Sequence, residues 1–352
     1  MNNQPYYYNP FEQNDSEYNN HQNTVFMLQQ EYFEEKKAIK KISRAIGLAI
    51  ISFVLAQTFL VVMFGGFAKA FKIDVLNTPT FSYGMLIFTS ILSVLVPFLI
   101  IAKSLKIKGN EILPNERLEK ADIFWYTCLG TGLCMVANVI TNFIVTILSS
   151  YGINLTQSEE SEPKTLVSSF LFFVSIAVVP AIVEEIAMRG VVLHAMVRYG
   201  KVFAIVSSAF VFGILHGNLI QAPFAFMVGI VLGFITIKTN SIIPAMLIHF
   251  CNNGLSAIAT ISGAFATEKV TNIVYYSFFL MWLILAVAAV PVLARRNWGV
   301  KKNETVLNDV KYTNPYLMST SKKIGTFFST VPMIISLIIL IVLTAGTVSI
   351  AR

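Results

Sequence analysis

The stretch SIAVVPAIVEEIAMRGVVL, residues 175–193, places two neighbouring glutamates inside an apolar run. A charged side chain at the centre of a membrane helix costs about 2.5–3.5 kcal/mol even on lenient insertion scales. Polar partners are therefore expected to face Glu184 and Glu185. The next apolar segments supply one histidine each, His216 and His249. Two carboxylates and two imidazoles in hydrophobic segments predict a buried catalytic or metal site.

The composition of the whole chain predicts a polytopic membrane protein. Of the 352 residues, 55% are hydrophobic and 13% are charged, whereas soluble domains have about a quarter charged. A hydrocarbon core of ~30 Å requires about 17–25 apolar residues per helix. Nine runs meet or approach this length, and the fifth is the shortest: 46–66, 83–102, 123–149, 165–188, 202–217, 220–237, 241–262, 274–294 and 328–350. We expect an all-α membrane bundle of eight to nine spans.

The basic residues predict how this bundle is oriented. Cytoplasmic loops of membrane proteins carry an excess of Lys and Arg. With the N-terminus inside, the inner segments hold 20 of the 26 Lys and Arg residues and the outer segments hold five. The loop 150–163, which is acidic, then falls outside. The net charge of +7 is thus a signal of topology, and the partner it indicates is the lipid bilayer and not a nucleic acid.

The sequence also predicts how the regions outside the candidate site are organised. Residues 1–45 are expected to form a polar, disordered cytoplasmic tail (1–24) followed by an interfacial helix (25–44). We expect three N-terminal spans over 46–149, a catalytic core over 165–262, an eighth span over 274–294, a cytoplasmic linker over 295–327 and a last span over 328–350. The three cysteines, Cys128, Cys134 and Cys251, are expected to be small buried hydrophobes. Asn138 and Asn142 share one helical face and are expected to bond to other helices, in preference to taking part in chemistry.

Three short motifs carry the chemistry. In Glu184-Glu185-x-x-x-Arg189, residues 185 and 189 are four apart on a helix and can pair. Glu184 lies about 100° around the helix and stays free for water or a metal ion. Phe212-x-x-x-His216 places an aromatic ring one turn before a histidine, and His249-x-x-x-Asn253 puts two polar side chains on one face.

These motifs, in this order, resemble those of the CAAX proteases and bacteriocin-processing enzymes, also called the CPBP or Abi family, which includes the type II CAAX prenyl endopeptidases. The resemblance covers about 165–262. It implies a four-helix catalytic core and an intramembrane endopeptidase that acts on a membrane-anchored or membrane-associated peptide or protein. It also implies a multi-pass protein of a bacterial cell membrane, in which leader peptides or bacteriocins would be substrates.

The family pattern implies a role for each motif residue. Glu184 would be the general base that activates a water. His216 would hold that water, directly or through a metal, and His249 and Asn253 would stabilise the oxyanion of the tetrahedral intermediate.

Glu185, Arg189 and Phe212 would support these groups. Pro180, just before the glutamates, is expected to leave backbone carbonyls free near the site.

Two questions stay open at the level of sequence. Glu184, His216 and His249 meet the ligand count of a catalytic zinc site, but a glutamate mechanism without a cofactor serves equally. The alternatives to a protease are a non-catalytic binding or immunity protein that keeps the fold and, less favoured, a proton-coupled transporter. For the motifs to meet, the turn Gly217–Gln221 is expected to lie within the membrane, shielded by protein, in combination with a tilt of the fifth and sixth spans.

Overall fold

A computed structural model describes residues 10–75, 77–114, 118–155, 162–296, 298 and 318–350, with side chains described from residue 26 to residue 348 within these ranges. Nearly every element is helical. The segments before the candidate core are α1 (Pro10–Ala70), α2 (Pro79–Ser90), η1 (Ile91–Leu95), α3 (Val96–Ser104), α4 (Gly109–Ile112), α5 (Lys120–Ser150) and β1 (Ile153–Leu155). The core and the C-terminal part comprise α6 (Leu166–Phe173), η2 (Val174–Val178), α7 (Val179–Glu185), η3 (Ile186–Leu193), α8 (His194–Val197), α9 (Lys201–Leu215), α10 (Gln221–Thr239), α11 (Ile243–Phe265), α12 (Glu268–Arg295), α13 (Thr320–Phe328), α14 (Val331–Ala345) and β2 (Val348–Ile350).

Long apolar helices confirm the membrane bundle. Within the described ranges, six continuous helical stretches are long and apolar enough to cross a membrane, and the pair α13–α14, bent by 76°, would make a seventh. The six are Phe26–Ala70, Pro79–Ser104, Lys120–Ser150, Leu166–Val197, Gln221–Thr239 and Glu268–Arg295. α9 has only 15 residues, and α11 carries a histidine and two asparagines. The count of eight to nine spans stays a prediction.

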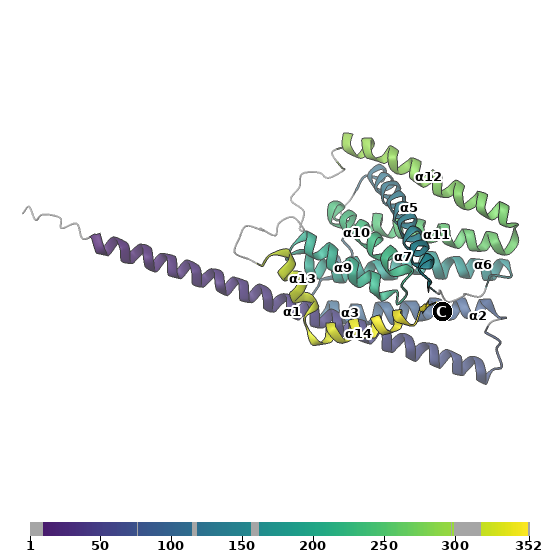
Figure 1. Cartoon of the computed structure of the whole chain (residues 1–352), viewed down its shortest axis with the longest axis horizontal. Coiled ribbons are helices and arrows are strands. Elements are labelled where there is room, and N and C mark those ends of the chain that lie inside the picture. The colour runs from purple at the N-terminus through teal and green to yellow at the C-terminus, as the bar shows by residue number, and fades with distance from the viewer. Residues whose placement is uncertain are drawn as a thin grey trace, which may run out of the picture.

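The first helix differs from the expected tail. α1 begins at Pro10, inside the segment 1–24, and continues without a break through the expected interfacial helix to Ala70. Residues 1–9 lie outside the described ranges. Figure 1 shows the first half of α1 projecting away from the bundle while its second half packs beside α2 and α3. The apolar residues that define the first span thus form one rod with the polar segment before them.

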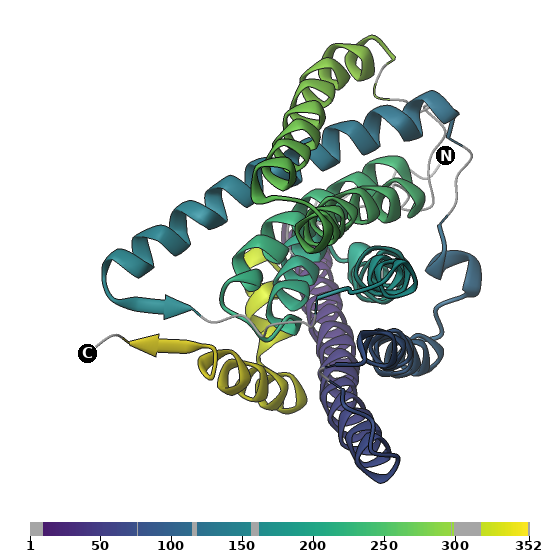
Figure 2. The same ribbon diagram turned by 90° about the vertical axis from the view of Figure 1, so that its right-hand side faces the viewer.

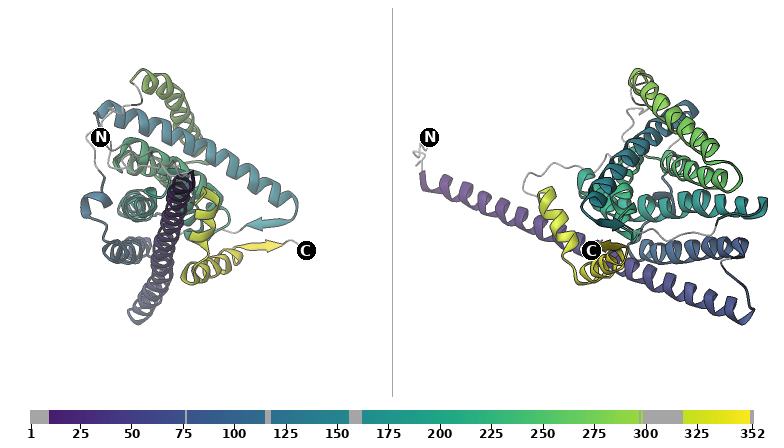
Figure 3. Two further views of the ribbon diagram at one scale, coloured as in Figure 1. Left: turned by 90° about the vertical axis from the view of Figure 1, so that its left-hand side faces the viewer. Right: turned by 45° about the vertical axis from the view of Figure 1, so that its right-hand side comes forward.

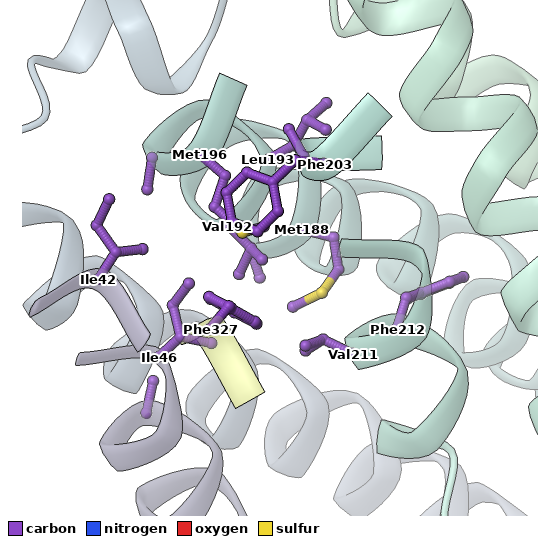
Figure 4. Close-up of a cluster of buried hydrophobic side chains, with 14 of the residues drawn as sticks. Ile42, Ile46, Met188, Val192, Leu193, Met196, Phe203, Val211, Phe212 and Phe327 are labelled. Carbon is purple, nitrogen blue, oxygen red and sulfur yellow. The ribbon is translucent and has the colours of Figure 1, made fainter. Parts of the chain in front are cut away.

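Two large apolar clusters hold the bundle together, and Phe212 of the second motif belongs to the first of them. The first joins α1, α3, η3, α8, α9, α10, α13 and α14, and it includes Ile46, Met188, Phe203 and Phe327 (Figure 4). The second joins α5, α10, α11 and α12. Figure 2 shows α5 crossing the bundle obliquely between α12 and the remaining helices. Cys128 and Cys134 are buried in the second cluster as expected, while Cys251 is half-buried.

The hairpin α9–α10 brings the second motif to the middle of the bundle. α9 has 15 residues and is about 22 Å long at 1.5 Å per residue, shorter than a ~30 Å hydrocarbon core. The hairpin packs closely because Gly213 and Gly229 lack side chains: a Cβ on Gly229 would lie 2.9 Å from Ala209. The turn after His216 is half-buried or buried, and the Asn218 side chain accepts the Ile220 N–H at 2.7 Å. These features agree with a turn that lies within the membrane and is shielded by protein.

Two short strands join distant parts of the chain. β1 and β2 pair antiparallel, with Asn154 opposite Ser349. A span was expected over 328–350, but the helix α14 covers only Val331–Ala345, and a strand follows it. The Thr347 hydroxyl, between them, accepts the Leu219 N–H at 3.4 Å. The C-terminal part therefore covers the turn next to His216.

The other end of this C-terminal part is held by a buried ion pair. In α13, within the expected linker 295–327, Lys323 lies 2.7 Å from Glu35 of α1, and its ammonium also donates to the Tyr199 carbonyl at 2.7 Å. Figure 3 shows α13 and α14 lying against α1. Residues 297 and 299–317 of this linker lie outside the described ranges.

Candidate active site

The helical stretch Leu166–Val197 carries the first motif and is not a regular α-helix. Two π-helical segments, η2 and η3, flank the short α7, and Pro180 is the second residue of α7. The stretch starts with a reciprocal cap, in which Thr165 and Ser168 each bond the other's backbone N–H. π-Helical turns occur frequently at functional sites because they re-aim side chains. Glu184 and Glu185 are the last two residues of α7.

Glu185 is the buried member of the glutamate pair. Its side chain has no exposed surface, and the guanidinium of Arg189, itself 2% exposed, lies 3.1 Å from it through both Nε and Nη1. The predicted pairing four residues apart is thus confirmed. A buried carboxylate requires such a partner, and Arg189 supplies it from the next turn of the same helical stretch.

His249 connects the third motif to both glutamates. Its Nδ1 lies 2.8 Å from Glu185 Oε1, and its Nε2 lies 4.0 Å from Glu184 Oε2. Because an ionised carboxylate can only accept a hydrogen bond, Nδ1 carries the proton and donates to Glu185. The other nitrogen, Nε2, then faces Glu184. Glu185 therefore fixes the orientation of the His249 ring, as carboxylates do for histidines in many hydrolases.

His216 is oriented by the end of its own helix. The last carbonyls of a helix lack partners, and the Phe212 carbonyl at the end of α9 lies 2.8 Å from His216 Nδ1. A carbonyl only accepts, so Nδ1 donates and Nε2 is left free. The Phe212 ring packs against His216 and His249, with ring centroids 4.9 and 6.0 Å away, and lies 4.6 Å from the Arg189 guanidinium carbon. Phe212 thus contacts one residue of each motif.

Asn253 is placed by Pro180. A proline has no N–H for the carbonyl four residues earlier, which here belongs to Ile176. Asn253 Nδ2 donates to that carbonyl at 3.0 Å. The expected free carbonyl is therefore present and anchors α11 to the stretch that carries the glutamates. One of the two amide hydrogens of Asn253 is used in this bond, and the other is left for a ligand.

Two cavities meet at Glu184. One, of about 300 Å³, lies between α1, α2, η1, α7 and α9. The other, of about 450 Å³, lies between α5, η2, α10 and α11. Six residues line both: Ile176, Pro180, Glu184, Phe212, His216 and Gln221. The Glu184 side chain keeps 29% of its surface exposed there. All motif residues named above except Glu185 and Arg189 line at least one cavity.

The second cavity also contains polar residues whose role the sequence did not indicate. Asn138 and Asn142 were expected to bond other helices, but both line this cavity, and neither side chain has a hydrogen bond to another described residue. The expectation was wrong because α5 crosses the bundle obliquely and leaves a space at this point. Asn252, next to the third motif, lines the same cavity. The placement of two asparagines on one face of a membrane helix was the only signal available.

The donor set does not fit a metal ion as it stands. Among the described residues, no three His, Cys, Asp or Glu side chains come together closely enough to hold one. Of the expected ligands, His249 has one nitrogen committed to Glu185, and its other nitrogen is 4.0 Å from Glu184. A shared zinc would require these side chains to move. The zinc site over Glu184, His216 and His249 stays a prediction.

Comparison with known proteins agrees with the motifs. No curated protein and no solved structure matches the chain. Residues 166–255 match the family described as type II CAAX prenyl endopeptidase Rce1-like. The matched segment runs from α6 into α11, so it includes every motif residue. This segment is therefore similar to the type II CAAX prenyl endopeptidases, over about a quarter of the chain.

Proposed function

We propose that this protein is an intramembrane endopeptidase in which Glu184 activates a water for hydrolysis of a peptide bond. The observation that carries the proposal is the different placement of two adjacent carboxylates. Glu185 is fully buried between Arg189 and His249, whereas Glu184 faces both cavities together with His216. One carboxylate is thus positioned for support and the other for chemistry.

The reaction follows from the free atoms at this point. Glu184 takes a proton from a water as the water oxygen attacks the scissile carbonyl carbon, and the carbonyl oxygen gains the electron pair. When the tetrahedral intermediate collapses, the C–N bond breaks, and Glu184 returns the proton to the leaving nitrogen. General acid–base catalysis of this kind contributes about 10²–10⁴-fold.

The remaining polar atoms supply the other requirements of this reaction. His216 Nε2, free because Nδ1 bonds the Phe212 carbonyl, accepts the second hydrogen of the water and so orients it. The second amide hydrogen of Asn253 is one donor for the oxyanion, and Nε2 of His249 is the other when the ring, which lies between Glu184 and Glu185, is protonated at both nitrogens. Donors fixed in advance in a dry site stabilise developing charge by about 3 kcal/mol each.

The substrate is a membrane-anchored or membrane-associated peptide, because the site lies inside an apolar bundle. For a bacterial cell membrane with a cytoplasmic N-terminus, the proposed substrates are leader peptides and other membrane-anchored chains. The similarity of residues 166–255 to type II CAAX prenyl endopeptidases adds prenylated peptides as a second substrate class to test.

The test is cleavage of a fluorogenic lipidated-peptide library by the detergent-purified protein. Glu184→Gln should lower kcat by at least about 100-fold, while Glu268→Gln, an exposed glutamate at the start of α12, should leave it unchanged. A zinc chelator added to the wild type tests the metal prediction. Full cleavage by Glu184→Gln would contradict the proposal. Biological activity retained by that variant would favour a binding or immunity role, and Glu184-dependent flux in liposomes would favour a transporter.

A further inference from the structure

The wall of the larger cavity presents side-chain amides that the proposed chemistry does not use. Asn138 and Asn142 face it from α5, and Asn252 faces it from α11. Polar side chains in the bilayer are costly unless they have partners. Neither asparagine of α5 bonds a described residue, and Asn252, which is 6% exposed, has a buried Oδ1 without a hydrogen-bond partner. A wall of this kind indicates a polar ligand.

A series of hydrogen bonds that begins next to Pro180 determines which atom of the Asn252 side chain is left without a partner. The carbonyl of Ile176, which the proline leaves free, only accepts, so Asn253 must present Nδ2 to it. Asn253 Oδ1 then faces Asn252, which donates to it through Nδ2 at 3.0 Å. Asn252 Oδ1 is therefore the end of the chain, and it can only accept a hydrogen bond. Its complement is an N–H group.

The spacing of the two asparagines on α5 matches an extended peptide. They are four residues apart, a rise of about 6 Å along the helix. Alternate residues of an extended strand are about 6.6–6.8 Å apart and present their N–H and C=O groups at the same edge. One extended peptide can thus bond both asparagines at one edge, while Asn252 meets it from the facing helix. A helical peptide cannot do so, because its backbone groups are bonded internally.

We infer that Asn138, Asn142 and Asn252 form a subsite that holds the substrate in extended form by its backbone, with an N–H of the peptide bonded to Asn252 Oδ1. The inference rests on the proposed function, because it names the form in which the substrate reaches Glu184. The enzyme would therefore select segments that unwind easily, such as those with glycine, proline or polar residues, over stable membrane helices.

The test starts from the library peptide that binds the Glu184→Gln protein most tightly and replaces its amides one at a time by esters, each of which removes one backbone N–H. Affinities are measured on the full-length Glu184→Gln protein, so that binding is read without turnover. On this background one ester position should weaken binding about tenfold. After the further substitution Asn252→Leu, the same ester should have no additional effect.

Two more variants keep this test decisive. Asn142→Leu, at an exposed position of α5, should weaken binding by a similar factor and change the response at a different backbone position. Thr141→Val is the matched control, because its hydroxyl already donates to the Ala137 carbonyl at 3.0 Å, and it should keep the full ester effect.

The results separate the subsite from the protease. Equal ester effects with and without Asn252, or no binding of the peptide series, would overturn the subsite even if Glu184 proves essential for cleavage. An ester effect that depends on Asn252, in a protein that cleaves nothing, would support the subsite and refute the peptidase.

Discussion

At the scale of single residues, two adjacent glutamates differ because of what surrounds them. Glu185 has Arg189 and His249 as partners and no exposed surface. Glu184 points about 100° away and meets a cavity on either side. The buried pair of Glu185 and Arg189 thus fixes the orientation of the His249 ring and leaves Glu184 free. The supporting pair and the proposed base are consequently separable by mutation.

Arg189→Leu should destabilise the protein more than the double variant Arg189→Leu/Glu185→Gln. Removing one partner of a buried pair leaves an unpaired charge and costs about 3–5 kcal/mol, whereas the double variant leaves a neutral amide that can still bond His249. The measurement is thermal unfolding in detergent. The control is Lys37→Met, which removes an ion pair with Glu34 in which both side chains are more than two-thirds exposed, and exposed pairs contribute at most about 1 kcal/mol. Equal unfolding temperatures for the single and the double variant would show that the buried Glu185 carboxylate does not depend on Arg189.

The contacts of some of these residues could be predicted from their spacing in the sequence, and those of others could not. The Glu185–Arg189 pair was predictable because it needs only one turn of helix. The unpartnered Oδ1 of Asn252 was not, because it depends on contacts between Ile176, Asn253 and Asn252 across two helices. Asn138 and Asn142 were misread for the same reason: the space beside α5 is a property of the packing.

At the scale of elements, Pro180 determines how two of the motif helices are joined. It interrupts the stretch Leu166–Val197 between two π-helical segments, and the carbonyl it leaves free holds α11 through Asn253. The hydrophobic runs predicted these helices because a membrane requires long apolar segments. The π-helical turns and the three-residue strands were not predictable, since their partners lie far away in the chain.

Pro180→Ala should lower activity without lowering stability. An alanine restores an N–H that can bond the Ile176 carbonyl and compete with the Asn253 amide, so Asn253 and Asn252 lose their fixed orientation. We expect kcat/KM to fall about tenfold, while the unfolding temperature is unchanged or higher, because the helix gains a hydrogen bond. Pro291→Ala in α12, an exposed proline within a helix, is the control and should not change activity. If Pro180→Ala lowered the unfolding temperature together with kcat/KM, the proposed role of Pro180 in orienting Asn253 would be contradicted.

At the scale of the whole molecule, the pairing of β1 with β2 constrains how often the chain crosses the membrane. Strands that pair must lie on the same side, so an even number of crossings separates Leu155 from Val348. Nine spans satisfy this condition. Seven spans also satisfy it if the hairpin α9–α10 enters and leaves the membrane on the same side. Eight spans do not. The pairing therefore narrows the predicted number of spans, and the charge distribution predicts that both strands lie outside.

A cross-linking experiment tests both the pairing and the side. In a protein whose three native cysteines are replaced by alanine, Asn154→Cys and Ser349→Cys lie opposite each other in the register, within the range over which a disulfide closes. Mild oxidation of intact cells should join them. A membrane-impermeant thiol reagent added beforehand should block the reaction if both lie outside. The pair Leu155→Cys and Ile350→Cys, two positions out of register, should join much more slowly. Rapid cross-linking that the impermeant reagent does not block would keep the pairing but reverse the orientation, and equal rates for both pairs would refute the register.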